Sequence, residues 1–385
     1  MESFLPYMTN DFSVGLYSED TDDIYHSAHG AVNEAYEKFI KPLNLKNILA
    51  KKDELKVLDI CFGIGYNTKV LINEFKRFKN KRIDIDCVDT NFQLMKLSPF
   101  ISTRINFIDR VLKQKELYKN INSYDEAKKI IELKKKRVRS HYKISQEVNY
   151  TILKELYKGE KIQIDNETKK ILTDNQNFLF FDKGILKIVE FLEKKEDKYY
   201  QSNILNAYLH NIYYKNITKR YINKYADIVS LNFFAQDIRD FVKNTSSVYD
   251  IVLLDGFTPL KCPCIWSQDF FEKLYSLMRQ DAILVTYNSS AVTRSALLNT
   301  GFFIGNTFDK KRNVVGTIAS KNDSLIKNKL TKKQLGLLGT RAGIPFRDAN
   351  LDLDNYEIIN NRKFEVENST LESSSRYLKR CKNEI

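Results

Sequence analysis

The chain has 385 residues, of which 43% are hydrophobic and 29% charged, as is typical of a globular protein that buries a large core. No apolar run approaches the roughly 20 residues of a membrane span, and the N-terminus lacks the basic-then-apolar order of a secretory signal. We therefore expect a cytoplasmic protein with no membrane association. The formal net charge of +13 favours an anionic partner such as nucleic acid.

The first part of the chain predicts a strand, a glycine loop and a second strand. Residues 16–25 are expected to be extended and residues 29–40 helical, with the helix ending near Pro42. A buried strand is then predicted from the apolar residues Val57, Leu58 and Ile60, a loop from Gly63 and Gly65, and a helix from Asn67 to Phe75. Such a glycine loop lets the backbone approach a cofactor closely. Residues 83–89 form the next apolar strand, which ends in Asp89.

The second half of the chain continues the alternation of strands and helices. Strands are predicted at 228–234, 249–255 and 282–287, and helices at 270–279 and 291–299. Residues 302–308 and 314–320 are expected to pair as a closing hairpin. The pattern predicts an α/β fold with a parallel sheet, in which ligands bind at the carboxyl ends of the strands. An added antiparallel hairpin is how Rossmann-like class I methyltransferases end.

A long segment separates the second and third strands. Residues 104–227 are basic and mainly helical in pattern, and they include the cluster Lys134–Arg139 with interleaved tyrosines. We interpret them as an inserted subdomain that either contacts nucleic acid or exposes an ordinary solvated surface. The expected organisation is residues 1–103 as the N-terminal segment and first half of the methyltransferase domain, 228–330 as its second half, and 331–385 as a C-terminal extension.

Two classes of cofactor compete for the glycine loop. A dinucleotide fold requires G-x-G-x-x-G, but Thr68 stands at the third glycine position counted from Gly63, so the pyrophosphate fingerprint is incomplete. S-adenosylmethionine carries no phosphate and needs only a tight turn beside its amino-acid portion. The sequence therefore favours a methyltransferase over a nicotinamide-dependent dehydrogenase.

Four acidic residues are expected at the carboxyl edge of the sheet: Asp59, Asp89, Asp237 and Asp255. Convergent carboxylates suit a cationic ligand that bears a ribose and amines, although each acid could instead cap the helix that follows it. The loop after Asp255 carries Phe257, Lys261 and Trp266. Trp266 could stack on a base or fill the core beneath the loop.

Metal binding is not expected. Cys262 and Cys264 stand close together, but a second cysteine pair is missing and the chain has four histidines, so the spacing does not fit a zinc site. The five cysteines also show no disulfide framework.

Five stretches of the sequence, in this order, resemble the MnmC-type tRNA methyltransferases: residues 16–25, 58–65, 254–266, 285–289 and 340–348. Members of that family occur fused to a flavin-dependent oxidase or alone, and this chain looks like the stand-alone form without the oxidase domain. The segment 104–227 lies outside the resemblance. One departure is Cys61, where the family usually has glycine.

The resemblance implies an activity and a set of site residues. The family N-methylates the aminomethyl group of 5-aminomethyluridine, often 2-thiolated, at the tRNA wobble position, and the product is 5-methylaminomethyluridine. S-adenosyl-L-methionine would be held by Glu19, Tyr25, Asp59, Gly63, Gly65, Asn67, Asp89 and Asp237. Phe257, Lys261 and Trp266 would meet the substrate, with tRNA as the partner and association with a separate oxidase or other wobble-uridine-modifying enzymes left open.

The chemistry of methyl transfer assigns the catalytic residues. Transfer from a sulfonium is an in-line displacement, so positioning supplies most of the acceleration. The reacting amine is largely protonated in water and must lose a proton to react, directly or through water. Asp255 is the main candidate to bind or deprotonate it, and Tyr287 is a second one. Two alternatives remain open: an RNA-binding protein with a degenerate methyltransferase fold, and a methyltransferase that acts on another substrate.

Overall fold

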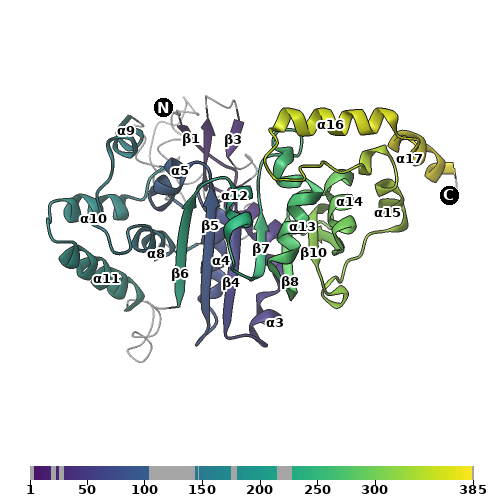
Figure 1. Ribbon diagram of the computed structural model, residues 1–385. Helices are drawn as coiled ribbons and strands as arrows, with labels where there is room; N and C mark the ends of the chain where they lie inside the picture. The colour runs from purple at the N-terminus through teal and green to yellow at the C-terminus, as the bar shows by residue number, and fades with distance from the viewer. Residues whose placement is uncertain are drawn as a thin grey trace, which may run out of the picture. The chain divides into compact units, whose positions relative to one another are not determined.

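The computed structural model describes residues 4–18, 23–25, 30–103, 144–145, 147–174, 180–214 and 228–383 (Figure 1). The chain divides into two compact units that interleave along the sequence. Unit 1 consists of residues 1–36, 63–77 and 93–227, and unit 2 of residues 37–62, 78–92 and 228–385. The segment 104–227 thus groups with the N-terminal residues rather than forming a body of its own.

Unit 2 is built on a seven-stranded sheet with the strand order β6-β5-β4-β7-β8-β10-β9. The five neighbouring strands β6, β5, β4, β7 and β8 pair in parallel, whereas β10 is antiparallel to both of its neighbours. This confirms the predicted parallel sheet with a closing hairpin. The strands are β4 (Glu54–Ile60), β5 (Arg82–Asp89), β6 (Val229–Ala235), β7 (Tyr249–Leu254), β8 (Met278–Thr286), β9 (Phe303–Phe308) and β10 (Val314–Ser320).

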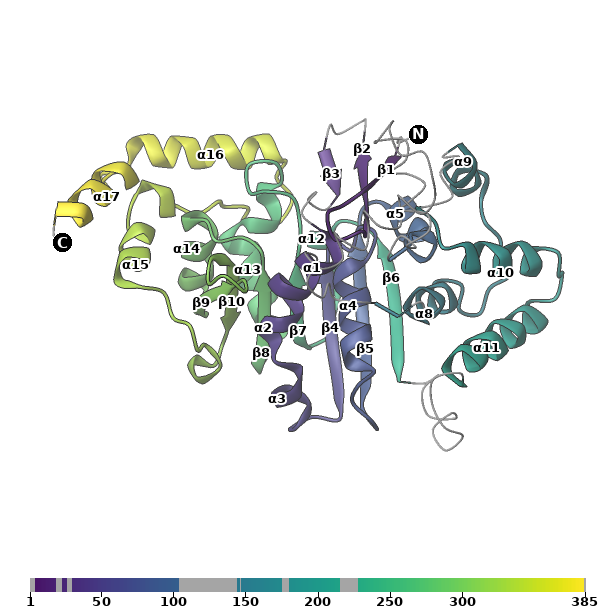
Figure 2. The same ribbon diagram turned by 180° about the vertical axis from the view of Figure 1, so that it is seen from behind.

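The helices of unit 2 cover the sheet and extend beyond it. Helix α12 packs against β5 and α13, α13 packs against α14, and α2 contacts β8. Figure 2 shows the face that carries α2 and α3, the opposite one to that of Figure 1. These helices are α2 (Lys41–Leu43), α3 (Leu45–Leu49), α12 (Ile238–Asn244), α13 (Gln268–Ser276), α14 (Ala291–Thr300), α15 (Lys332–Leu338), α16 (Asn355–Asn368) and α17 (Ser374–Asn383).

The core of unit 2 is large and aromatic. Trp266, Phe270 and Phe271 have no exposed surface and pack with the apolar side chains of β7, β8 and α14. Burying such a side chain contributes roughly 1.5–3 kcal/mol. The hairpin is tied to α14 by Arg294, whose guanidinium donates to Thr317 Oγ1 at 2.9 Å, Asn306 Oδ1 at 2.9 Å and the Gly316 carbonyl at 3.1 Å.

Unit 1 combines a small antiparallel sheet with helices. In the order β1-β2-β3, residues 16–18 and 23–25 of the expected extended segment belong to two antiparallel strands, and residues 19–22 lie outside the described residues. Helices α8, α10 and α11 lie side by side in both ribbon views. Its elements are β1 (Phe4–Met8), β2 (Val14–Ser18), β3 (Asp23–Tyr25), α1 (Ala31–Glu34), α4 (Tyr66–Phe75), α5 (Phe92–Leu97), α8 (Glu147–Leu156), α9 (Asn166–Asp174), α10 (Lys183–Glu193) and α11 (Lys198–Tyr214). None of the helices that the structure describes has the length and hydropathy to span a bilayer.

The helix predicted over residues 29–40 is corrected by the structure. Helix α1 gives way to a π-helical turn over Ala35–Ile40, and α2 follows it directly. Pro42 therefore lies inside α2 rather than beyond the last turn. Proline is tolerated there because the first turn of a helix needs no donor from its backbone nitrogen.

Lys69 is the least expected residue of α4, because its side chain has no exposed surface. Its ammonium donates to the Ser98 carbonyl at 2.7 Å and lies 5.3 Å from the centroid of the Tyr66 ring. Burial lowers the pKa of Lys69 to about 7 from its ordinary 10.5, and the charge of Asp182 offsets only part of this effect. Between these two pKa values the unfolded chain therefore binds one more proton than the folded chain.

Replacing Lys69 with methionine should change how stability depends on pH. The wild-type free energy of unfolding should rise between about pH 7 and pH 10.5, because there only the unfolded state holds the proton. Lys69→Met removes this slope. The free energy of unfolding of the variant should therefore exceed that of the wild type most below pH 7, and the difference should shrink towards pH 10. Chemical denaturation at a series of pH values measures this difference.

Lys187→Met, which removes an exposed lysine of α10, controls for the loss of one charge. Parallel stability curves for the wild type and Lys69→Met across the whole series would show that the buried ammonium does not titrate in this range.

Candidate cofactor and catalytic site

The carboxyl ends of four neighbouring strands meet at one edge of the unit 2 sheet. Asp89 ends β5 opposite Ala235 of β6, and Ile60 of β4 lies opposite both Val88 and Leu254. Asp255 directly follows β7, and its backbone N–H donates to the Ile60 carbonyl at 3.3 Å. The acids that the sequence assigned to this edge therefore follow one another across β6, β5, β4 and β7.

The turn after β4 has the backbone conformation that a glycine loop requires. The N–H groups of Cys61 and Phe62 both donate to the Val88 carbonyl, at 3.0 and 3.1 Å. Cys61, Gly63 and Gly65 then have φ values of 62°, 55° and 79°, in the left-handed region that favours glycine. Position 61 is where the resemblance expects glycine, and the conformation explains why.

Negative charge gathers around Cys61. Burial raises the pKa of its thiol well above the ordinary value, and the charges of Asp89, Asp255 and Asp59 raise it further. Each of these carboxylates disfavours another anion at this position. The same negative charges attract a cation, such as a sulfonium or an ammonium, to this edge of the sheet.

Asp89 and Asp237 are held differently, although both follow strands at this edge. The Asp89 carboxylate accepts a hydrogen bond from the Asn91 N–H at 2.8 Å, and its own carbonyl accepts from the Gln236 N–H at 3.1 Å. Asp237 caps α12 by accepting from the Arg239 N–H. It also accepts from the Arg239 guanidinium at 2.9 Å.

The Arg239 guanidinium also reaches Asp348 at 3.0 Å and the Leu353 carbonyl at 2.7 Å. Burial alone would raise the pKa of Asp237, but the hydrogen bonds from Arg239 outweigh it and lower that pKa. Arg239 of α12 thus anchors the C-terminal segment, and Asp237 holds its guanidinium.

The loop after Asp255 is supported by two aromatic residues. The Tyr287 hydroxyl donates to the Gly256 carbonyl at 2.9 Å, and the Trp266 indole donates to the Phe257 carbonyl at 2.8 Å. Their rings meet edge to face, with centroids 6.1 Å apart. Since the donated proton of Tyr287 points at a backbone carbonyl, its evident contribution is to hold the loop.

The assignment of Trp266 to substrate binding is corrected by its burial. Its side chain is 0% exposed, and a ring with no exposed surface cannot stack on a base. Phe257 is partly exposed and Lys261 exposed on the same loop. Of the three substrate-binding candidates on this loop, Phe257 and Lys261 therefore reach the surface and Trp266 does not.

The remaining candidates belong to unit 1. Gly63 and Gly65 lie in the loop, Gly65 immediately precedes α4, and Asn67 is buried in its first turn. The loop is braced from within unit 1, because Ser98 Oγ donates to the Ile64 carbonyl at 2.9 Å while Lys69 donates to the Ser98 carbonyl. Tyr25 lies in β3, and Glu19 lies outside the described residues.

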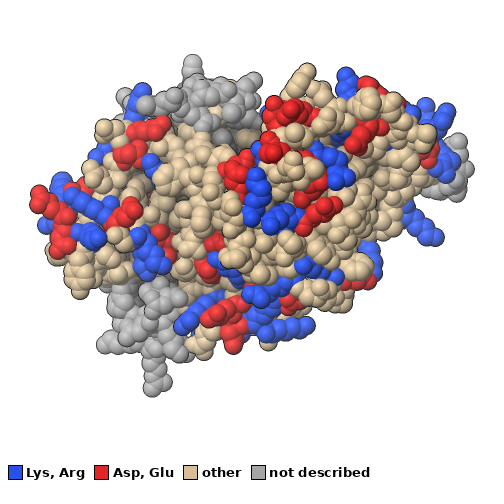
Figure 3. Space-filling view, viewed as in Figure 1, with Lys and Arg blue, Asp and Glu red and all other residues tan. Residues whose placement is uncertain are grey.

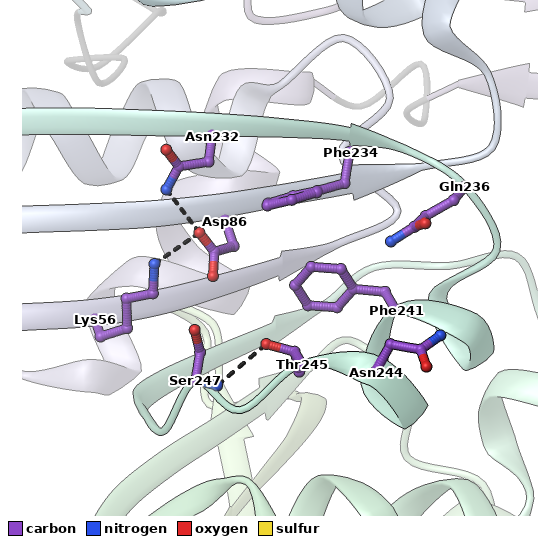
Figure 4. Close-up of a pocket in the computed structure, with 9 residues that line it drawn as sticks. All are labelled: Lys56, Asp86, Asn232, Phe234, Gln236, Phe241, Asn244, Thr245 and Ser247. Carbon is purple, nitrogen blue, oxygen red and sulfur yellow. Dashed lines mark hydrogen bonds and ion pairs between the residues drawn. The ribbon is translucent and has the colours of Figure 1, made fainter.

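A polar cavity of about 360 Å³ in unit 2 was not anticipated (Figure 4). The ammonium of Lys56 bridges Asp84 and Asp86, at 2.7 Å from each, and Asp86 also accepts from the Tyr249 hydroxyl at 2.8 Å. A sequence signal existed, because polar residues alternate with isoleucine at the start of β5. The cavity is lined by Lys56, Asp86, Asn232, Phe234, Gln236, Phe241, Asn244, Thr245 and Ser247.

Known proteins resemble both the sequence and the fold. Residues 200–322 match the family model described as S-adenosyl-L-methionine-dependent methyltransferase. The bifunctional protein MnmC of Campylobacter concisus, named for tRNA 5-methylaminomethyl-2-thiouridine biosynthesis, is 29% identical over 35% of this chain and 23% of its own length. The crystal structure of MnmC2 from Aquifex aeolicus aligns over 95% of this chain and 86% of its own, with a TM-score of 0.56 and 17% identity.

The match over residues 200–322 shows an S-adenosyl-L-methionine-dependent methyltransferase, and the chain is similar to MnmC proteins over part of its length. An uncharacterized protein of Methanocaldococcus jannaschii is similar over more of the chain, with 23% identity over 92% of this chain and 70% of the relative. In contrast, this chain spans about a quarter of the length of the Campylobacter concisus MnmC. The resemblance to that bifunctional protein therefore covers only a part of it.

Gly65→Asp should weaken cofactor binding. The substitution places a carboxylate in the loop, where it would crowd and repel the carboxylate of S-adenosylmethionine. Gly159→Asp is a matched control, because Gly159 has nearly the same φ, 78°, and a Cβ there would meet nothing within 4 Å. Calorimetry should show weaker cofactor binding for Gly65→Asp alone; equal affinities in both variants would refute the placement.

Proposed function

We propose that this methyltransferase acts on tRNA and N-methylates the aminomethyl group of 5-aminomethyluridine, or of its 2-thio form, at the wobble position. The observation that carries the proposal is that Asp59, Asp89 and Asp255 come to the same carboxyl edge of the sheet, on or directly after neighbouring strands. Such an edge suits two cationic groups, a sulfonium and a protonated amine. The name of the MnmC relatives supports the choice of tRNA as the substrate.

The residues present fit the cofactor. The alternating positive φ values of the loop leave room for backbone contact with the amino-acid portion, Asn67 would lie beside it, and Asp89 would accept from ribose hydroxyls. Bound S-adenosylmethionine supplies an electrophilic methyl group. We keep Asp237 in a supporting role, since it accepts several hydrogen bonds from Arg239.

Asp255 is our candidate for the residue that binds and deprotonates the amine. It directly follows β7 at the acidic edge, and its loop is fixed by the hydrogen bonds from Tyr287 and Trp266. A carboxylate there would bind the ammonium form of the substrate, accept its proton directly or through water, and leave the nitrogen lone pair free to attack. Phe257 and Lys261 would line the entrance for the nucleotide.

Asp255→Asn should keep the fold and lose most methyl transfer. The amide preserves the shape of the side chain but cannot accept the proton, and general acid–base help is typically worth about 10²–10⁴-fold. The assay is mass spectrometry of nucleosides after incubation of tRNA bearing 5-aminomethyluridine with S-adenosylmethionine. We expect 5-methylaminomethyluridine with the wild type. Turnover of Asp255→Asn close to that of the wild type would remove this residue from the mechanism.

The segment 104–227 is proposed to add RNA contacts. Its cluster Lys134–Arg139 lies outside the described residues, and on the face shown in Figure 3 basic and acidic side chains are interspersed. Neutralising Lys134, Lys135, Lys136, Arg137 and Arg139 should weaken tRNA binding and flatten its dependence on salt, by a slope of slightly less than one for each phosphate that the variant no longer neutralises. Superimposable plots of tRNA affinity against salt would mean that the cluster is only a solvated surface.

A further inference from the structure

An exposed tyrosine stands at the start of α16. Tyr356 is 75% exposed, and it lies in a first turn that is fixed by a reciprocal capping box between Asp354 and Glu357. Two residues further on, the fully buried Ile358 seats the helix on unit 2. The aromatic ring is thus presented to solvent on a rigid element rather than on a mobile loop.

The start of α16 adjoins the loop that carries Asp255. Helix α16 packs against the 3₁₀ turn Pro263–Trp266 of that loop, and Asn355 Nδ2 donates to the Lys261 carbonyl at 3.4 Å. Leu260, the neighbour of Lys261, is 72% exposed. Tyr356 thus follows directly the residue that contacts this loop, and we call the exposed residues Leu260, Lys261 and Tyr356 the α16 rim.

We propose that the α16 rim holds a nucleobase of the RNA that flanks the modified nucleotide, with the base stacked on Tyr356. The inference rests on the proposed function, because it assigns a second contact to the same RNA substrate. A single-stranded loop offers unstacked bases, and proteins that read such loops stack them on aromatic side chains. Lys261, exposed on the loop that Asn355 contacts, adds a cation that suits an adjoining phosphate.

RNA explains the rim better than a protein partner does. The rim begins on the loop through which the substrate must reach Asp255, and it combines a flat aromatic ring with a lysine rather than forming a broad apolar surface. Further along the same helix, Phe364 is 68% exposed, but it lies about two turns beyond Tyr356. Phe364 therefore provides a matched control for the loss of an exposed aromatic ring from α16.

Tyr356→Ala should raise the KM for tRNA bearing 5-aminomethyluridine by roughly 10-fold, within the range that alanine substitution of a stacking residue produces. The kcat and the affinity for S-adenosylmethionine should stay unchanged, because the ring contacts neither the amine nor the cofactor. Tyr356→Phe and Tyr356→Trp should restore the KM, since each keeps an aromatic face. Phe364→Ala should change it by less than about 2-fold.

Four results would overturn the inference. Tyr356→Ala could leave the KM unchanged, or Phe364→Ala could raise it as much, which would indicate a general effect on α16. Sedimentation could instead show that Tyr356→Ala converts a dimer into a monomer, which would assign the rim to a second copy of the chain. A wild-type protein that binds S-adenosylmethionine yet does not methylate this tRNA would overturn the proposed function together with the rim. The missing wild-type activity distinguishes this outcome from a failure of the rim alone.

Discussion

Parallel pairing of β6, β5, β4, β7 and β8 is the constraint on which the site depends. It brings the carboxyl ends of the strands to one edge. Residues far apart in the chain, such as Asp89 and Asp255, therefore both raise the pKa of the Cys61 thiol. Carboxylates concentrated near a buried position disfavour one another. A site of this kind is stabilised when a cation binds, and the sulfonium of S-adenosyl-L-methionine is such a cation.

The acids of unit 2 fall into two groups. Asp86, Asp237 and Asp269 are paired with Lys56, Arg239 and Arg347, and they hold strands, helices and the C-terminal segment together. Asp59, Asp89 and Asp255, whose charges raise the pKa of Cys61, lie at the carboxyl edge of the sheet. The sequence alone cannot separate these groups, because a strand-end acid that anchors a helix has the same local pattern as one that binds a ligand.

The sequence predicted the elements whose signals are local. The glycine loop, the strands of the large sheet and the closing hairpin follow from apolar periodicity and from positions that favour glycine. Strand β1 was missed, as was α16, where Ile358 is the one fully buried residue and no apolar stripe marks a helix. For Trp266 the sequence left two interpretations open, stacking on a base or filling the core, because a lone loop tryptophan suits both. The burial of its ring, which meets Tyr287 edge to face, decides for the core.

The central claim is that the acidic carboxyl edge and the glycine loop bind S-adenosylmethionine. Calorimetric titration of the purified protein with this cofactor, and in parallel with a nicotinamide dinucleotide, tests it most directly. The account predicts saturable binding of S-adenosylmethionine at one site per chain and no binding of the dinucleotide, because Thr68 replaces the glycine that a pyrophosphate requires. Binding of the dinucleotide without binding of S-adenosylmethionine would contradict the account.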